Sequence, residues 1–160
     1  MKLTITETTY TTKKIACTRA YLNSMLCKSK YSPDVILEYL KMYPDISIGS
    51  VRYYDNAVTL LCSAYCKHTT TDIIKLLDYL LLTYDINTRS RYCMTPLLAA
   101  ISSGNLDIAK YLVSKGAKFF VYSQLIRSDF TSLDGYVVGK PAVRKFVVDG
   151  IYNEVTAVSV

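Results

Sequence analysis

The feature that most constrains the fold is a helical pattern that recurs along the chain at nearly constant spacing. The segments "DIIKLL" from Asp72 and "DIAKYL" from Asp107 agree at four of six positions. A similar apolar pattern follows Asp34 and another follows Ala142, so the four expected helices start 38, 35 and 35 residues apart. Self-similarity with such a period predicts repeated supersecondary units that stack on one another.

Residues at the ends of these patterns supply helix start and stop signals. Ser32 and Asn105 offer side-chain oxygens that can cap a helix N-terminus, and Thr70 and Thr71 play the same part for the middle helix. Gly116 stands where a left-handed residue commonly ends a helix. The signals therefore agree with the apolar periodicity.

A shorter helical pattern lies ahead of each of the two central helices. It covers Thr59 to Cys66 in one unit and Thr95 to Ser102 in the next, and both segments carry small residues where a neighbouring helix must approach closely. The predicted unit is a turn, a short helix, a tight loop and a longer helix. Such a pair cannot bury its apolar face alone, so the units must stack.

This pattern resembles the ankyrin repeat, in which a turn and two helices occupy about 33 residues with a TPLHxA motif. Thr95, Pro96 and Leu97 match the motif, Ala100 follows, and Leu98 stands where the family has His. The next unit toward the N-terminus matches less well and carries about three extra residues in "DYLLLTY". The resemblance implies an all-α ankyrin-repeat solenoid.

Length and resemblance together imply one domain over residues 1–160 with about four units and divergent terminal capping units. Residues 1–12 and 154–160 are expected to be flexible or to cap the stack. The fourth unit has an alternative, because Asp134 and Gly135 could turn a hairpin in place of a first helix. The expected units span residues 14–48, 49–88, 89–121 and 122–153.

Composition predicts a packed, soluble protein from a reducing compartment. Hydrophobic residues make up 51% of the chain and charged residues 20%, which is the balance of a globular domain. Five cysteines form an odd set without a secretory segment, so we expect free thiols and a location in the cytoplasm or the nucleus. The net charge of +6 is scattered rather than clustered, which favours a mildly basic surface over a nucleic-acid site.

The candidate chemistry is limited to one cluster of thiols and an imidazole. Cys62, Cys66 and His68 could seed a zinc or redox site if Cys93 folded back as a fourth ligand. The alternative, which we favour, is that the two thiols on a first helix are core packing. The six glycines are isolated and match no nucleotide-binding loop. We therefore expect no enzyme, no cofactor and no metal.

What remains is a surface that binds another protein. In ankyrin proteins the turn tips and the exposed edge of the first helices line a concave face, and the resemblance carries these positions onto this chain. Arg, Tyr, Met and Phe at the tips are side chains that interfaces favour. The predicted partner-binding residues are Asp55, Asn56, Val58, Lys67, Arg91, Tyr92, Met94, Ser102, Ser103, Arg127, Ser128 and Phe130.

The units are unequal in length and rich in Tyr, Ile and Lys, and in this style they resemble ankyrin proteins of large DNA viruses, poxviruses above all. That resemblance implies a monomeric viral protein that binds and occludes an innate-immune or NF-κB-type signalling protein in the host cytoplasm. One alternative is a cellular or bacterial adaptor, which would need a second apolar surface on the convex face. Another is nucleic-acid binding through the basic surface.

Overall fold

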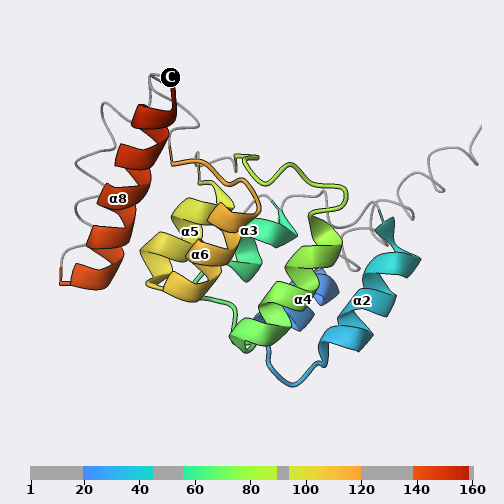
Figure 1. Cartoon of the computed structure of the whole chain (residues 1–160). Coiled ribbons are helices and arrows are strands. Elements are labelled where there is room, and N and C mark those ends of the chain that lie inside the picture. The colour runs from blue at the N-terminus through green and yellow to red at the C-terminus, as the bar shows by residue number, and fades with distance from the viewer. Residues whose placement is uncertain (1–19, 45–55, 90–93, 120–138, 159–160) are drawn as a thin grey trace, which may run out of the picture.

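The computed structural model describes residues 20–44, 56–89, 94–119 and 139–158, and these residues form helices and connections without a strand (Figure 1). No helix of this described part is long and apolar enough to cross a bilayer. Residues 20–27 are helical. They are followed by α2 (Pro33–Met42), α3 (Ala57–Leu61), α4 (Thr70–Leu80), α5 (Pro96–Ser103), α6 (Leu106–Ser114) and α8 (Pro141–Val158).

Four helices begin where the repeated pattern predicts them. Helices α2, α4, α6 and α8 start at Pro33, Thr70, Leu106 and Pro141, each within two residues of the expected start. The same four segments lie in order along the molecule, with α2 at one end and α8 at the other (Figure 1). The all-α repeat fold is therefore confirmed.

The caps explain these boundaries. Ser32 Oγ accepts a hydrogen bond from the backbone N–H of Val35 at 3.4 Å, and Asn105 Oδ1 accepts one from Ile108 at 3.2 Å. The middle helix is capped by Thr69 rather than by Thr70 or Thr71, which lie inside α4. Each capping oxygen satisfies a backbone donor that the first helical turn leaves without a partner.

Glycines end the two helices of the third unit. Gly104, with φ +74°, ends α5, and Gly116, with φ +98°, follows the C-cap of α6. The prediction for Gly116 is confirmed, because side chains rarely adopt this left-handed backbone and glycine adopts it readily.

Helix α3 is shorter than the predicted segment from Thr59 to Cys66. Asn56 Oδ1 accepts the N–H of Thr59 at 2.8 Å, which starts the helix at Ala57. Beyond Leu61 the backbone turns, and Ser63 Oγ donates to the carbonyl of Leu60 at 2.7 Å. Cys62 and Cys66 therefore do not share a helix, contrary to the prediction.

The helices pack in two rows around a leucine-rich core. Helices α3 and α5 are neighbours in the row of first helices, α2, α4 and α6 follow one another in the row of second helices, and α5 packs on α6. The largest buried side chains of α4, Leu76, Leu77 and Leu80, are at most 1% exposed. Each fully buried leucine contributes about 1.5–3 kcal/mol relative to an exposed one, so the stack is stabilised mainly by its shared core.

Hydrogen bonds also link neighbouring units directly. His68 is buried, and its Nε2 lies 2.8 Å from the carbonyl oxygen of Met25 in the preceding unit. The backbone N–H of Lys67 donates to the carbonyl of Cys27 at 3.2 Å. These bonds join the turn after α3 to the C-terminal end of the helix at residues 20–27.

Helix α8 is joined to the third unit at both of its ends. Lys140 Nζ donates to the carbonyl of Ser102 at 3.3 Å, and Glu154 Oε1 accepts the backbone N–H of Phe119 at 2.6 Å. The rings of Phe119 and Phe146 meet edge to face with centroids 5.5 Å apart. The helix continues to Val158, so residues 154–158 belong to α8. The predicted first half of the fourth unit and residues 1–12 lie outside the described residues.

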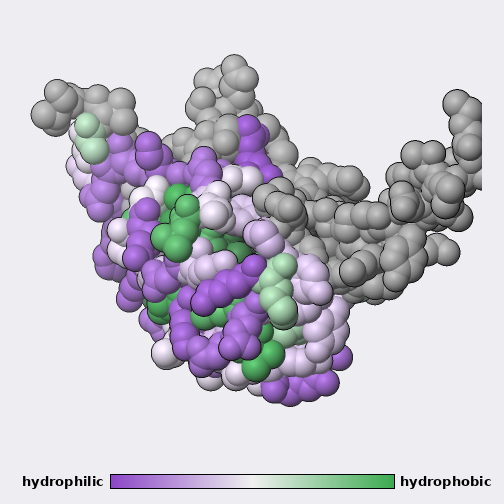
Figure 2. Space-filling model, turned by 90° about the vertical axis from the view of Figure 1, so that its right-hand side faces the viewer, coloured by the Kyte–Doolittle hydropathy of each residue, from purple (hydrophilic) through white to green (hydrophobic). Residues whose placement is uncertain are grey.

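The opposite end carries a cluster of tyrosines. The ring of Tyr21 lies 6.1 Å from that of Tyr31 and 5.4 Å from that of Tyr39, and Tyr39 lies 5.0 Å from Tyr43. Figure 2 shows this end with its apolar groups in separate areas between hydrophilic ones. Such a mixed surface suits the outer unit of a solenoid.

Candidate functional site

The described residues include half of the predicted binding surface. The predictions at Asp55, Arg91, Tyr92, Arg127, Ser128 and Phe130 lie outside the described part of the chain. The other six residues have defined positions and are described below in three pairs.

Asn56 and Val58 are interior residues, so their prediction as partner-binding residues is wrong. Asn56 is 4% exposed and Val58 is 1% exposed. The side-chain oxygen of Asn56 caps the N-terminus of α3. Because the helix then begins at Ala57, Val58 is its second residue and points into the core. In this structure neither side chain presents surface to a partner.

Lys67 is exposed, and it lies in the connection after α3 rather than on the first helix. Its Nζ donates to the carbonyl of Ala64 at 3.1 Å, a contact that leaves the ammonium group open to solvent. Met94 is half-buried and packs against the core ahead of α5. Of these two residues, Lys67 presents the larger surface to a partner.

Ser102 and Ser103 are half-buried at the C-terminal end of α5. Ser102 Oγ donates to the carbonyl of Ala99 at 3.0 Å. Ser103 Oγ lies 2.7 Å from the same carbonyl and 3.3 Å from that of Cys62, so this hydroxyl links the second and third units. Both serines therefore have a structural role beside the predicted one.

In the candidate cluster, the thiol of Cys62 is buried in the core, that of Cys66 packs against the core, and the imidazole of His68 contacts a backbone carbonyl. Burial raises the pKa of the Cys66 thiol to about 11 and that of Cys62 further still, so both remain protonated at neutral pH. His68 directs Nε2 at Met25 O. Cys93, the fourth ligand of the zinc alternative, lies outside the described residues, and among those described no group of His, Cys, Asp or Glu could hold a metal ion.

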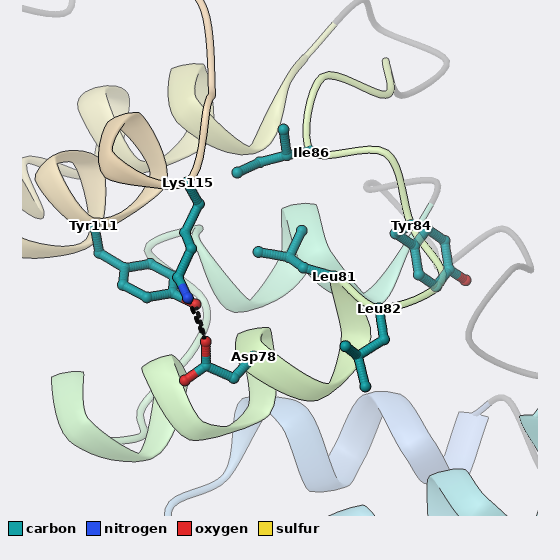
Figure 3. A pocket seen from close by; sticks show the side chains of 7 residues that line it. All are labelled: Asp78, Leu81, Leu82, Tyr84, Ile86, Tyr111 and Lys115. Atoms are coloured by element: carbon teal, nitrogen blue, oxygen red, sulfur yellow. Dashed lines mark hydrogen bonds and ion pairs between the residues drawn. The ribbon is translucent and has the colours of Figure 1, made fainter.

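A pocket that the sequence did not predict lies between the C-terminal ends of α4 and α6 (Figure 3). We refer to it as the α4–α6 pocket. Its volume is about 260 Å³. The lining residues are Asp78, Leu81, Leu82, Tyr84, Ile86, Tyr111 and Lys115.

The polar end of the α4–α6 pocket is a three-residue network. Asp78 Oδ1 accepts the Tyr111 hydroxyl at 2.6 Å and lies 3.1 Å from Lys115 Nζ. The hydrogen bond from Tyr111 and then the Lys115 ammonium group lower the pKa of Asp78. Burial and the Asp78 carboxylate raise the pKa of the Tyr111 phenol. At neutral pH the network therefore holds one carboxylate, one ammonium and one neutral phenol.

The connection after α4 forms the opposite wall, and Asn87 holds it in place. The Asn87 side chain donates to the carbonyl of Gly116 at 3.4 Å and accepts the N–H of Lys118 at 3.0 Å. Its own backbone N–H donates to Asp85 Oδ1 at 2.9 Å. These bonds join two units and fix the half-buried Ile86, next to Asn87, as part of the wall.

One sequence signal could have indicated this pocket. Helix α4 has eleven residues where α6 has nine, and the extra residues noted in "DYLLLTY" provide Leu81 and Leu82. Leu82 is 79% exposed, so it is not required by the core.

A row of helix pairs that share one core and contact only their neighbours defines an α-solenoid repeat protein. A family model for ankyrin repeats, in three copies, matches residues 25–122. The match covers more than half of the chain, which therefore belongs to the ankyrin-repeat family. No curated protein and no solved structure matches the chain. Ankyrin repeats are generic protein–protein interaction modules, and this class of function applies here.

Proposed function

We propose that the chain is a viral host-interaction protein that binds and occludes a host innate-immune or NF-κB-type signalling protein. The observation that carries the proposal is the match of three ankyrin copies over residues 25–122, since ankyrin repeats are protein–protein interaction modules. The viral and host-directed part is supported by the unequal, Tyr- and Lys-rich units of the sequence. Binding without catalysis is the expected mode of action.

The proposed interface includes the exposed Lys67. Met94, Ser102 and Ser103 are half-buried and are also proposed to contact the partner. The other proposed contacts are Asp55, Arg91, Tyr92, Arg127, Ser128 and Phe130. A partner that covers this face would be kept from its own binding partners, which is occlusion.

The net charge of +6 adds an electrostatic component. Complementary charge increases the rate of association more than the final affinity, and salt screens this effect. An acidic partner should therefore associate more slowly as the salt concentration rises.

The test is a pull-down from animal-cell lysate with the purified chain, followed by mass spectrometry of the bound proteins. The variant Arg91→Glu plus Tyr92→Ala should lose the partner that the unchanged protein captures. A matched control is Lys41→Glu plus Tyr43→Ala, which alters an exposed lysine and an exposed tyrosine at the end of α2. Unchanged capture by the first variant would show that the interface is placed wrongly.

An adaptor that holds two partners is the second candidate function, and a specific observation favours it. The α4–α6 pocket is lined by residues of α4, of α6 and of the connection after α4, and none of them is a residue of the proposed interface. An occluding protein needs one binding surface, whereas an adaptor needs two. Nucleic-acid binding would be revealed by a gel shift at low salt, and we expect none.

A further inference from the structure

We infer that the α4–α6 pocket is a second binding site, and that it takes an aliphatic side chain of a partner protein flanked by acidic residues. This surface lies outside the interface of the proposed function. The two sites can therefore be tested separately.

The size of the pocket indicates what can enter it. Sites for drug-sized ligands and cofactors span about 300–1,000 Å³ and enclose most of the ligand. The α4–α6 pocket holds about 260 Å³ and is partly open to solvent. One aliphatic side chain on a peptide segment fits such a volume better than a cofactor does.

The middle of the pocket is apolar where the stack does not require it. Leu81 and Ile86 are half-buried there, and Leu82 is 79% exposed at the rim. Leu82 follows α4 and has the highest exposed fraction among the exposed large apolar side chains of the described residues. An exposed leucine beside half-buried apolar side chains offers apolar surface that a partner's side chain can cover, and removing such surface from water is favourable.

The walls are held before any partner arrives. Asn87 ties the connection after α4 to the segment that follows α6, through Gly116 and Lys118. On the other side, Tyr111 and Asp78 join α6 to α4. A preorganised pocket loses little conformational entropy on binding, which favours measurable affinity from a small contact.

The charges around the pocket favour acidic flanking residues. The carboxylates of Asp78 and Asp85 already accept hydrogen bonds from Tyr111, Lys115 and the backbone of Asn87. Lys115 uses one ion pair and is half-exposed, so its ammonium group has donors left. Lys118 does not line the pocket, but its backbone N–H bonds to Asn87, next to the wall residue Ile86; Lys118 is exposed and makes no ion pair within the described ranges. The groups that can still bind a charged partner are therefore lysine ammonium groups, and the net charge of +6 also favours an acidic partner.

Methyl NMR of the full chain, labelled at Leu and Ile methyl groups, tests this directly. The probe is a blocked pentapeptide with a central leucine between glutamates. We expect it to shift the methyl signals of Leu81, Leu82 and Ile86 at concentrations up to about 5 mM, the range of weak single-side-chain contacts. A peptide with serine at the centre, and one with lysines in place of the glutamates, should shift them much less.

Variants of the chain give the matched comparison. Leu82→Ser, at an exposed position that does not threaten folding, should weaken binding of the leucine peptide about tenfold. Met42→Ser, which removes a 66% exposed side chain from α2, should leave binding unchanged. Lys118→Glu should weaken binding of the glutamate-flanked peptide.

Several results would overturn the inference. These are the absence of shifts at the pocket methyls, equal shifts from the serine peptide, or equal binding of the lysine-flanked peptide. Pocket shifts that appear with protein concentration alone would assign the site to a second copy of the chain. The variant Arg91→Glu plus Tyr92→Ala should bind the peptide normally, so failure here is distinguishable from failure of the proposed function.

Discussion

Replacing His68 by alanine should destabilise the stack although His68 lies in a turn. The imidazole is 8% exposed, and its Nε2 lies 2.8 Å from the carbonyl oxygen of Met25. A carbonyl can only accept, so the ring must carry its proton on Nε2 and donate it. This bond joins the first unit to the second, at a helix end where carbonyl groups lack partners within the helix.

The size of the effect follows from the loss of one partner of a buried bond. A net hydrogen bond contributes about 0.5–1.5 kcal/mol, but leaving a buried carbonyl unsatisfied costs about 1–3 kcal/mol. Met25 is 1% exposed, so water cannot readily replace the imidazole. Together with the lost packing, His68→Ala should lower the free energy of unfolding by about 2–3 kcal/mol. For a chain of this length that corresponds to a Tm lower by roughly 4–12 °C.

Urea unfolding followed by circular dichroism measures this change. His68→Gln, which keeps an amide donor, should recover part of the loss, and Lys67→Ala at the exposed neighbour should cost less than about 0.5 kcal/mol. His68 is the sole histidine of the sequence, so one set of imidazole NMR signals reports the tautomer without assignment. A loss below about 0.5 kcal/mol for His68→Ala, or a proton found on Nδ1 at neutral pH, would refute the reasoning.

Three further predictions concern other contacts. Because the pKa of Asp78 is lowered by folding, its contribution is present above about pH 4 and is lost as pH falls through the lower folded value. Tyr111→Phe should therefore reduce the stability difference between neutral and acid pH by about 0.5–1 kcal/mol, and an unchanged difference would contradict the role of this bond. A methyl group at Gly150 would overlap the Phe119 ring. Gly150→Ala should thus destabilise by about 1 kcal/mol in thermal melts but stabilise in a Phe119→Ala background, where only helix propensity acts, and the same sign in both would contradict this. With a pKa of about 11, the half-buried Cys66 should react with iodoacetamide at pH 8 roughly 200-fold more slowly than an ordinary thiol, as peptide mass spectrometry can measure; a normal rate would show that its surroundings do not raise the thiol pKa.

The second helices could be predicted because their signals are local. Ser32 and Asn105 cap helices whose apolar residues recur with helical period, and Gly116 ends one of them. Each signal acts within one turn of the backbone, so a single sequence is sufficient to locate it. The agreement of these signals at a constant spacing then fixed the repeat fold.

The first helix of the second unit was less predictable for a physical reason. All five residues of α3 are buried, so the helix has no polar face and its sequence lacks the amphipathic periodicity from which helices are predicted. Its start depends on the side chain of Asn56. Its end depends on Ser63, which bonds to Leu60. The resulting shift moved Asn56 and Val58 from the predicted surface into the interior.

The α4–α6 pocket could not be predicted, because its parts are distant in sequence. Asp78 meets Tyr111 and Lys115 only when the second and third units stack. Nothing local indicates that Asn87 will reach Gly116. The one available hint was a helix longer than its repeat requires.

The two surfaces differ in how freely they can vary. In a solenoid each unit contacts only its neighbours, and lengthening a connection costs little conformational entropy. Extra residues after α4 can therefore be accommodated without displacing the core leucines of the same helix. The row of first helices has less freedom, because His68 and Ser103 use their side chains to bond the preceding unit. A longer connection between units can thus add a binding surface to this stack with a smaller loss of stability than a change within the helices.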